Sequence, residues 1–147
     1  MRIERILVAI DFSPHSEKAL KHAIGLAKSL DAELHLVHAY HVALPVGPPN
    51  QVAVPPQFWT DIREAADRRL QETLQGVEAE GVQCVGHLTA MSPAPGISET
   101  ADEVGADLIV MGTRGNTGLR HVLLGSVAER TLRLSNVPVL TVKADEA

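Results

Sequence analysis

The sequence predicts a single α/β domain in three layers, with a parallel β-sheet covered by helices on both faces. Apolar runs suited to strands alternate along the chain with segments of helical periodicity, the order typical of such sheets. Two of the runs, Ile6–Ile10 and Leu108–Met111, are almost uninterrupted, as in central strands that are buried on both sides. The length of 147 residues suits one domain, and neither a linker nor an internal repeat divides it.

The first strand is expected at Ile3–Ile10. Ser13 and Pro14 follow as an N-cap and a first-turn proline, which predicts the start of a helix. Apolar residues then recur at helical spacing as far as Leu30. The second strand is expected at Glu33–Tyr40.

Residues 41–56 contain five prolines and predict a long loop, a feature that in compact domains is often functional or mobile. A long helix follows, with apolar residues at helical spacing from Trp59 to Val77. Gly81 is expected to end it in the position just after the helix, where glycine is favoured.

The second half of the chain repeats the alternation. Ser92 and Pro93 predict the start of a short helix and Gly105 its end. The other expected elements are strands at Val82–Thr89, Asp107–Met111 and Val137–Val142, and a last helix over Ser126–Ser135.

Composition excludes several classes of protein. The net charge of −5 and the lack of clustered basic residues make a non-specific nucleic-acid binder a poor candidate. The single cysteine, Cys84, rules out a disulfide within the chain, and its apolar neighbours favour a small buried side chain. No apolar run reaches the roughly 18 residues of a membrane span, and the N-terminus is too short and charged for a signal peptide. A cytoplasmic protein without membrane insertion is therefore expected.

The stretch from Gly112 to Ser126, GTRGNTGLRHVLLGS, joins the fourth strand to the last helix. In open α/β sheets, ligands bind beyond the carboxyl ends of the strands, where the strand order reverses. Glycines allow close approach and positive φ, and a helix N-terminus attracts anions, so the stretch suits a phosphate chain. The alternative is purely structural. Ser126 and Glu129 have the spacing of a capping box, and the glycines could be ordinary loop residues.

The stretch is neither a Walker A loop, since the chain has no Gly-Lys pair, nor a GxGxxG fingerprint. Its spacing, Gly112-x2-Gly115-x9-Gly125-Ser126, resembles the ATP-binding pattern of the universal stress protein family. The flanking segments ILVAIDFSPHSEKAL, ADLIVMG and LLGSVAERTLRLSNVPVLTVK are also similar to that family. The resemblance extends from Ile6 to Lys143 and is weakest over 41–56, which is expected to be a variable loop.

This resemblance implies a five-stranded parallel sheet of order 3-2-1-4-5 that binds ATP, with Mg²⁺ or Mn²⁺ accompanying the nucleotide. The adenine would lie near the ends of the first two strands, and the ribose and phosphates along the glycine stretch. Carried over to this chain, the implied binding residues are Ala9, Ile10, Asp11, Ala39, Met111, Gly112, Arg114, Gly115, Gly125, Ser126 and Val127.

Two of these residues have structural alternatives. Asp11 could instead stabilise the N-terminus of the first helix, and Arg114 could be a solvated loop residue. The family also implies a homodimer formed through the apolar edge strand Val137–Val142, with a dimer of dimers as the alternative and a regulatory protein as the unknown partner. Pro138 lacks an N–H group and would limit that pairing.

The sequence predicts neither a catalytic residue nor a protein metal site. His35 and His38 should face opposite sides of their strand and so could not share an ion. Trp59 is expected in the core or at an interface. Two alternatives to a regulatory ATP-binding dimer stay open, a slow ATPase and a dimer that binds no nucleotide.

Overall fold

The computed structural model describes residues 1–42, 48, 54–115 and 123–145, and over these the predicted alternation of strands and helices is confirmed. The strands are β1 (Arg5–Ala9), β2 (Glu33–Ala39), β3 (Cys84–Thr89), β4 (Leu108–Gly112) and β5 (Val139–Val142). The helices are α1 (Pro14–Leu30), α2 (Pro56–Ala79), α3 (Pro93–Val104) and α4 (Ser126–Leu134).

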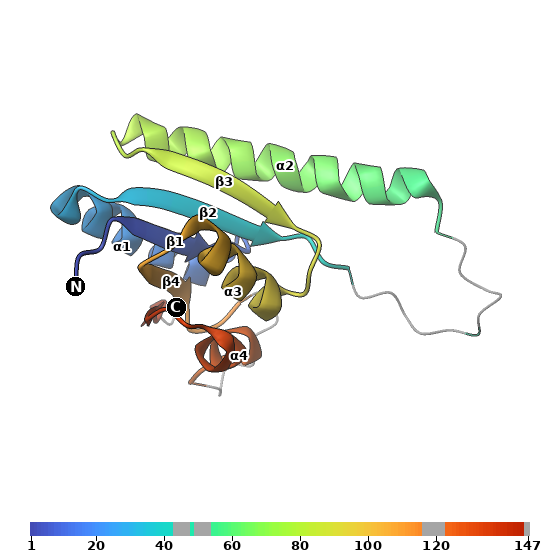
Figure 1. Ribbon diagram of the computed structural model, residues 1–147. Coiled ribbons are helices and arrows are strands. Elements are labelled where there is room, and N and C mark those ends of the chain that lie inside the picture. The colour runs from blue at the N-terminus through green and yellow to red at the C-terminus, as the bar shows by residue number, and fades with distance from the viewer. Residues whose placement is uncertain (43–47, 49–53, 116–122, 146–147) are drawn as a thin grey trace.

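The strands form one parallel sheet in the order β3-β2-β1-β4-β5, as the family resemblance implied. The central strand β1 lies between β2 and β4, so Ile6 pairs with Leu34 on one side and Leu108 on the other. Helices α1 and α2 cover one face, and α3 and α4 cover the other (Figure 1). The strand order reverses between β1 and β4, and their carboxyl ends are where a ligand is expected.

The core has two halves because side chains of a strand alternate between the faces. Ile6 and Val8 pack with α1 and α2, and Leu7 packs with α3 and α4. All three side chains are fully buried, which confirms a central strand covered on both faces. Each such side chain stabilises the fold by about 1.5–3 kcal/mol relative to an exposed one.

Most predicted helix ends are confirmed. The Ser13 hydroxyl caps α1 by accepting a hydrogen bond of 3.2 Å from the Ser16 N–H, and Ser92 is the N-cap residue of α3. Gly81 follows α2 with φ of +83°, and Gly105 ends α3 with φ of +65°. Both glycines have the left-handed conformation that other residues adopt at a cost.

Several strand boundaries are shorter than predicted. β1 begins at Arg5, β3 at Cys84 and β5 at Val139. At β5 the cause is Pro138, whose carbonyl accepts a hydrogen bond from the Ile109 N–H but whose nitrogen has no hydrogen to donate.

Two further predictions are wrong in detail. The cap of α4 is Gly125, and Ser126 is already helical, so there is no capping box with Glu129. Trp59 is 41% exposed on the first turns of α2, so it is not a core residue. The predicted loop at 41–56 lies largely outside the described residues, and α2 begins at its last residue, Pro56. None of the described helices has the length and apolar character needed to cross a membrane.

Candidate functional site

A cavity of about 610 Å³ opens beyond the carboxyl ends of β1, β2 and β4 and is closed by the first turns of α3 and α4. It lies where the strand order reverses. Every binding residue implied by the family pattern contributes to its wall, namely Ala9, Ile10, Asp11, Ala39, Met111, Gly112, Arg114, Gly115, Gly125, Ser126 and Val127. The sequence analysis missed other wall residues, among them Ser16, His38, His41, Ile97 and Glu129.

The end of β1 is fixed to the start of α1 by polar contacts. The Asp11 carboxylate accepts a hydrogen bond of 3.0 Å from the Ser13 N–H, and the Asp11 N–H donates to the Ser16 hydroxyl at 3.3 Å. Asp11 also borders the cavity. Its carboxylate therefore stabilises the start of α1 while remaining part of the cavity wall.

Phe12 turns the chain between β1 and α1 with a left-handed φ of +62°, a conformation that costs a bulky residue about 1–2 kcal/mol. Packing offsets this cost. The Phe12 ring lies 4.6 Å from the His38 ring between centroids, and the Arg69 guanidinium of α2 lies 4.0 Å from the Phe12 centroid. These contacts connect α2 to the wall of the cavity through His38.

The chemistry of His38 follows from its hydrogen bond. Nδ1 lies 2.8 Å from the Ile10 carbonyl oxygen and must donate to it, so Nε2 carries the lone pair when the ring is neutral. Burial lowers the pKa of His38, and the Arg69 charge lowers it further, against the opposing effects of the Ile10 carbonyl and of Asp11. A neutral ring whose second nitrogen can only accept is therefore favoured at neutral pH.

The stability of the fold should fall as the pH drops below about 6.5. The folded-state pKa values of both His38 and His87 are depressed, His87 by burial and by His35 against the opposing effect of Glu103. The unfolded chain, with histidine pKa values near 6.5, then binds more protons than the folded one. Calorimetric melting temperatures should be lower at pH 5.5 than at pH 7.5, and His38→Gln combined with His87→Gln should flatten this slope. An unchanged slope in the double variant would contradict the assignment.

The glycines have reasons within the protein itself. A Cβ added at Gly112 would lie 2.9 Å from the His15 Cβ, and one at Gly115 would lie 2.5 Å from Asp11 Oδ2. A Cβ at Gly125 would lie 3.1 Å from the Thr113 carbonyl oxygen. None of these three glycines has positive φ, so that part of the prediction is wrong for them, and Gly118 lies outside the described residues. Their absent side chains let the stretch pack closely against β1 and α1.

The N-terminus of α4 gives the cavity an end suited to anions. Backbone N–H groups in the first turn of a helix have no partner within it, and no side chain caps α4. Ser126, Val127 and Ala128 of this turn line the cavity. Glu129, which also lines it, has its carboxylate 2.6 Å from the Arg133 guanidinium, which offsets part of its charge. The positive end of the helix dipole thus borders the cavity.

Protein metal ligands do not gather at this cavity. Over the described part of the chain, no group of three His, Cys, Asp or Glu residues is placed to hold an ion. The prediction that His35 and His38 face opposite sides of β2 is confirmed, because His35 contacts His87 and His38 contacts Phe12.

The model of the universal stress protein family matches residues 2–143. The chain belongs to this family. A universal stress protein of Methanocaldococcus jannaschii, MJ0531, is 40% identical over 144 residues, which cover 95% of this chain and 82% of that protein. Among solved structures, MJ0577 of the same organism superposes with a TM-score of 0.80 at 26% identity, with both chains fully covered.

Two other solved members of the family contain adenine nucleotides. A universal stress protein in complex with cAMP has a TM-score of 0.73 at 26% identity, covering 99% of this chain and 100% of that one. The universal stress protein of Archaeoglobus fulgidus in complex with dAMP has a TM-score of 0.68 at 27% identity, covering 97% and 100%.

Proposed function

We propose that this universal stress protein binds ATP in the 610 Å³ cavity as a regulatory ligand. One observation carries the proposal. All residues of the family's binding pattern meet around a single cavity that is bordered by the uncapped N-terminus of α4. That helix end would bind the phosphates together with Gly112, Gly115 and Gly125, and solved relatives that contain cAMP and dAMP support an adenine ligand.

The opposite end of the cavity suits adenine. Ala9, Ile10 and Ala39 supply apolar surface for the base. Asp11 and the neutral His38 ring offer hydrogen-bond acceptors, which match the exocyclic amine of adenine or the ribose hydroxyls. The carbonyl oxygen at the same position of guanine would be repelled by these acceptors, so ATP should bind more tightly than GTP.

A divalent ion, Mg²⁺ or Mn²⁺, would enter with the nucleotide. The described residues provide no three-ligand site of their own, so the phosphate oxygens and water would form most of its coordination shell. The ion would offset the repulsion between the triphosphate and the carboxylates of Asp11 and Glu129 in the cavity wall. Arg114, from the same wall, would contact a phosphate.

The biological role proposed here is that of a cytoplasmic homodimer whose nucleotide occupancy favours one conformation or one protein partner. The dimer would form through β5 and the residues before it, Val137–Val142. β5 lies at the edge of the sheet, where it pairs only with β4 among the described strands.

Calorimetric titration of nucleotide-stripped protein with ATP and Mg²⁺ tests the proposal. Saturation near one ATP per chain is expected, with weaker binding of GTP under the same conditions. Phosphate release above that of a non-binding variant would identify a slow ATPase. An absence of heat, confirmed by equilibrium dialysis, would contradict the proposal and favour a dimer that binds no nucleotide.

A further inference from the structure

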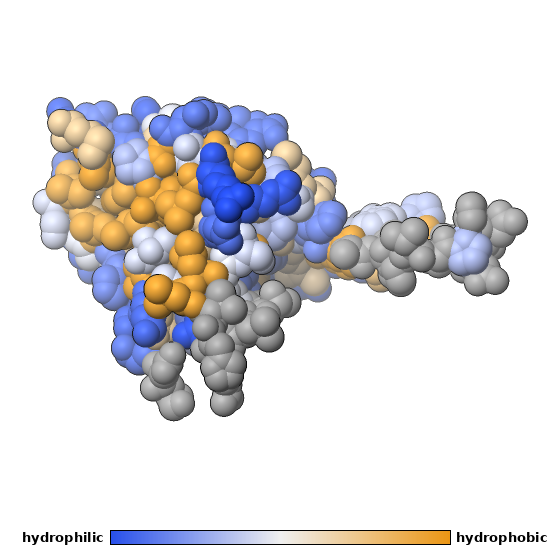
Figure 2. All heavy atoms as spheres, turned by 90° about the horizontal axis from the view of Figure 1, so that it is seen from below, coloured by the Kyte–Doolittle hydropathy of each residue, from blue (hydrophilic) through white to orange (hydrophobic). Residues whose placement is uncertain are grey.

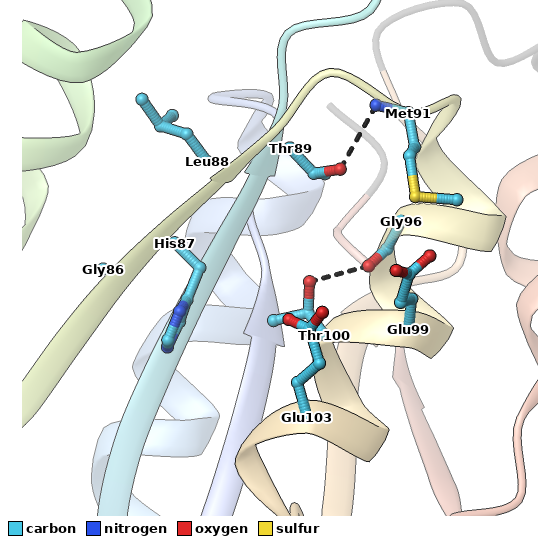
Figure 3. A pocket seen from close by; sticks show the side chains of 9 residues that line it. All are labelled: Gly86, His87, Leu88, Thr89, Met91, Gly96, Glu99, Thr100 and Glu103. Carbon is cyan, nitrogen blue, oxygen red and sulfur yellow. Dashed lines mark hydrogen bonds between the residues drawn. The ribbon is translucent and has the colours of Figure 1, made fainter.

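A second cavity, of about 390 Å³, lies between β3 and α3 and shares no wall residue with the proposed nucleotide site (Figure 3). One wall comes from β3 and includes His87 and Thr89. The other comes from α3 and includes Glu99, Thr100 and Glu103. Figure 3 shows the His87 imidazole and the two glutamate side chains rising from opposite walls of this groove.

His87 is part of a chain of polar side chains that continues beneath the groove. Its Nε2 lies 2.9 Å from Nδ1 of His35, the diagonal neighbour on β2. Nε2 of His35 lies 3.5 Å from the Glu33 carboxylate and has no closer partner, although His35 is only 8% exposed. The sequence gave no sign of this pairing, because His35 and His87 are 52 positions apart.

The carboxylate at the end of this chain determines where the protons lie. A lone pair on His35 Nε2 would face the negative Glu33, so the proton of the neutral ring belongs on Nε2. Nδ1 of His35 then has the lone pair and must accept from Nε2–H of His87. The remaining nitrogen of His87, Nδ1, is thereby left as an unprotonated electron-pair donor.

This order of groups is the one that surrounds many metal-binding histidines. Such a histidine coordinates the ion through one nitrogen and donates its other N–H to a group that is fixed in turn by a carboxylate. Here His35 and Glu33 would fix the tautomer of His87. Burial, with a contribution from His35, lowers the pKa of His87, which keeps the ring neutral and available at pH 7.

The facing wall is negatively charged. Glu103 is close enough to His87 to affect its pKa, acting in the raising direction. Neither Glu99 nor Glu103 forms an ion pair with another described residue. An imidazole nitrogen opposite a carboxylate is a ligand combination typical of Zn²⁺ and related borderline ions rather than of Mg²⁺.

We propose that the groove between β3 and α3 binds one divalent transition-metal ion, with Zn²⁺ as the model ion, through Nδ1 of His87 and the carboxylate of Glu103. His35 and Glu33 are positioning residues. Because no three such side chains converge among the described residues, water would complete the coordination shell and the site would exchange its ion readily. The inference does not depend on nucleotide binding.

Titration of nucleotide-free, chelator-treated protein with Zn²⁺ in the presence of a weak chromophoric competitor tests the proposal. One Zn²⁺ per chain is expected to bind, with Mg²⁺ unable to compete. His87→Gln and Glu103→Gln should each weaken binding at least about tenfold, and Glu33→Gln should do so through its effect on the relay. His22→Gln on the exposed surface of α1 and His41→Gln in the other cavity are controls that should leave the affinity unchanged.

Nitrogen NMR of the imidazoles supplies a second readout. Without metal, both His35 and His87 should be Nε2–H tautomers, and Zn²⁺ should shift Nδ1 of His87 specifically. Circular dichroism establishes that each variant is folded. Zinc affinity that is unchanged in folded His87→Gln, a His87 ring protonated on Nδ1, or no zinc binding by the wild type would each overturn the proposal.

Discussion

The substitution Ser126→Asp is expected to weaken ATP binding roughly tenfold to a thousandfold while leaving the fold at least as stable as before. Ser126 is the first residue of α4, is exposed and lines the proposed phosphate end of the cavity. A carboxylate about 4 Å from a phosphate would raise the binding free energy by about 1–4 kcal/mol between the bulk-water and protein-surface limits. Each 1.4 kcal/mol is about a tenfold change in the dissociation constant.

The stability should change in the opposite direction to the affinity. A negative side chain in the first turn interacts favourably with the helix dipole by about 0.3–1 kcal/mol. The melting temperature of ligand-free Ser126→Asp protein should therefore equal or exceed that of the wild type. This combination separates a direct effect on phosphate binding from damage to the fold, which would lower both quantities.

Ser126→Asn is the matched control, since it has nearly the same shape as the aspartate variant without its charge. Its ATP affinity, measured by calorimetry, should stay within a few fold of the wild type, and raising the salt concentration should narrow the gap between the two variants. If both variants bind ATP as the wild type does, the phosphates do not reach α4 and the proposed orientation of the nucleotide is incorrect.

Replacing the glycines is a less specific test. Side chains at Gly115 and Gly125 would first meet Asp11 and the Thr113 carbonyl of the protein itself, at 2.5 and 3.1 Å. Such variants would move the backbone of the glycine stretch even in the absence of a ligand. Their loss of binding would therefore not separate a contact with ATP from a displaced loop.

Much of the fold could be predicted because local signals agreed with the overall pattern. The Ser13–Pro14 and Ser92–Pro93 pairs mark helix starts, and the left-handed Gly81 and Gly105 lie where the sequence placed them. Strand order is not a local property. It came from the family resemblance, which also grouped residues from β1, β2, β4 and α4 that the structure brings to one cavity.

What the sequence could not indicate depends on contacts between distant elements. The left-handed Phe12 is stabilised by His38 and Arg69, which belong to two other elements. His35 was correctly judged unable to share an ion with His38, but its actual neighbour, His87, is set by the register between β2 and β3. Ser126 shows the reverse case, where a correct local motif fails because Gly125 already has the extended cap conformation.

Leu140→Lys is expected to convert the proposed homodimer into a monomer. Leu140 lies on the edge strand β5 and is 40% exposed, and Leu132 and Leu134 of α4 are each 45% exposed. Figure 2, which views the molecule from below the orientation of Figure 1, shows hydrophobic residues gathered over a broad area of this side. Exposed apolar edges favour pairing with another chain.

The expected effect is large because a symmetric interface contains each position twice. Burying a leucine stabilises by about 1.5–3 kcal/mol, so removing two copies should weaken the dimer by roughly 3–6 kcal/mol, before any repulsion between the paired lysines. This corresponds to at least about a hundredfold rise in the dissociation constant. Sedimentation velocity at concentrations where the wild type is dimeric would measure it.

Leu30→Lys is the control, since Leu30 is also 45% exposed but lies at the end of α1 that precedes β2, away from β5. It should leave the dimer mass unchanged, whereas an unchanged mass in Leu140→Lys would exclude β5 as the interface. The wall of the proposed nucleotide cavity is formed by a single chain, so monomeric Leu140→Lys protein should still bind ATP with wild-type affinity. A parallel loss of ATP binding would instead mean that the second chain completes the site, which would make assembly a condition for sensing the nucleotide.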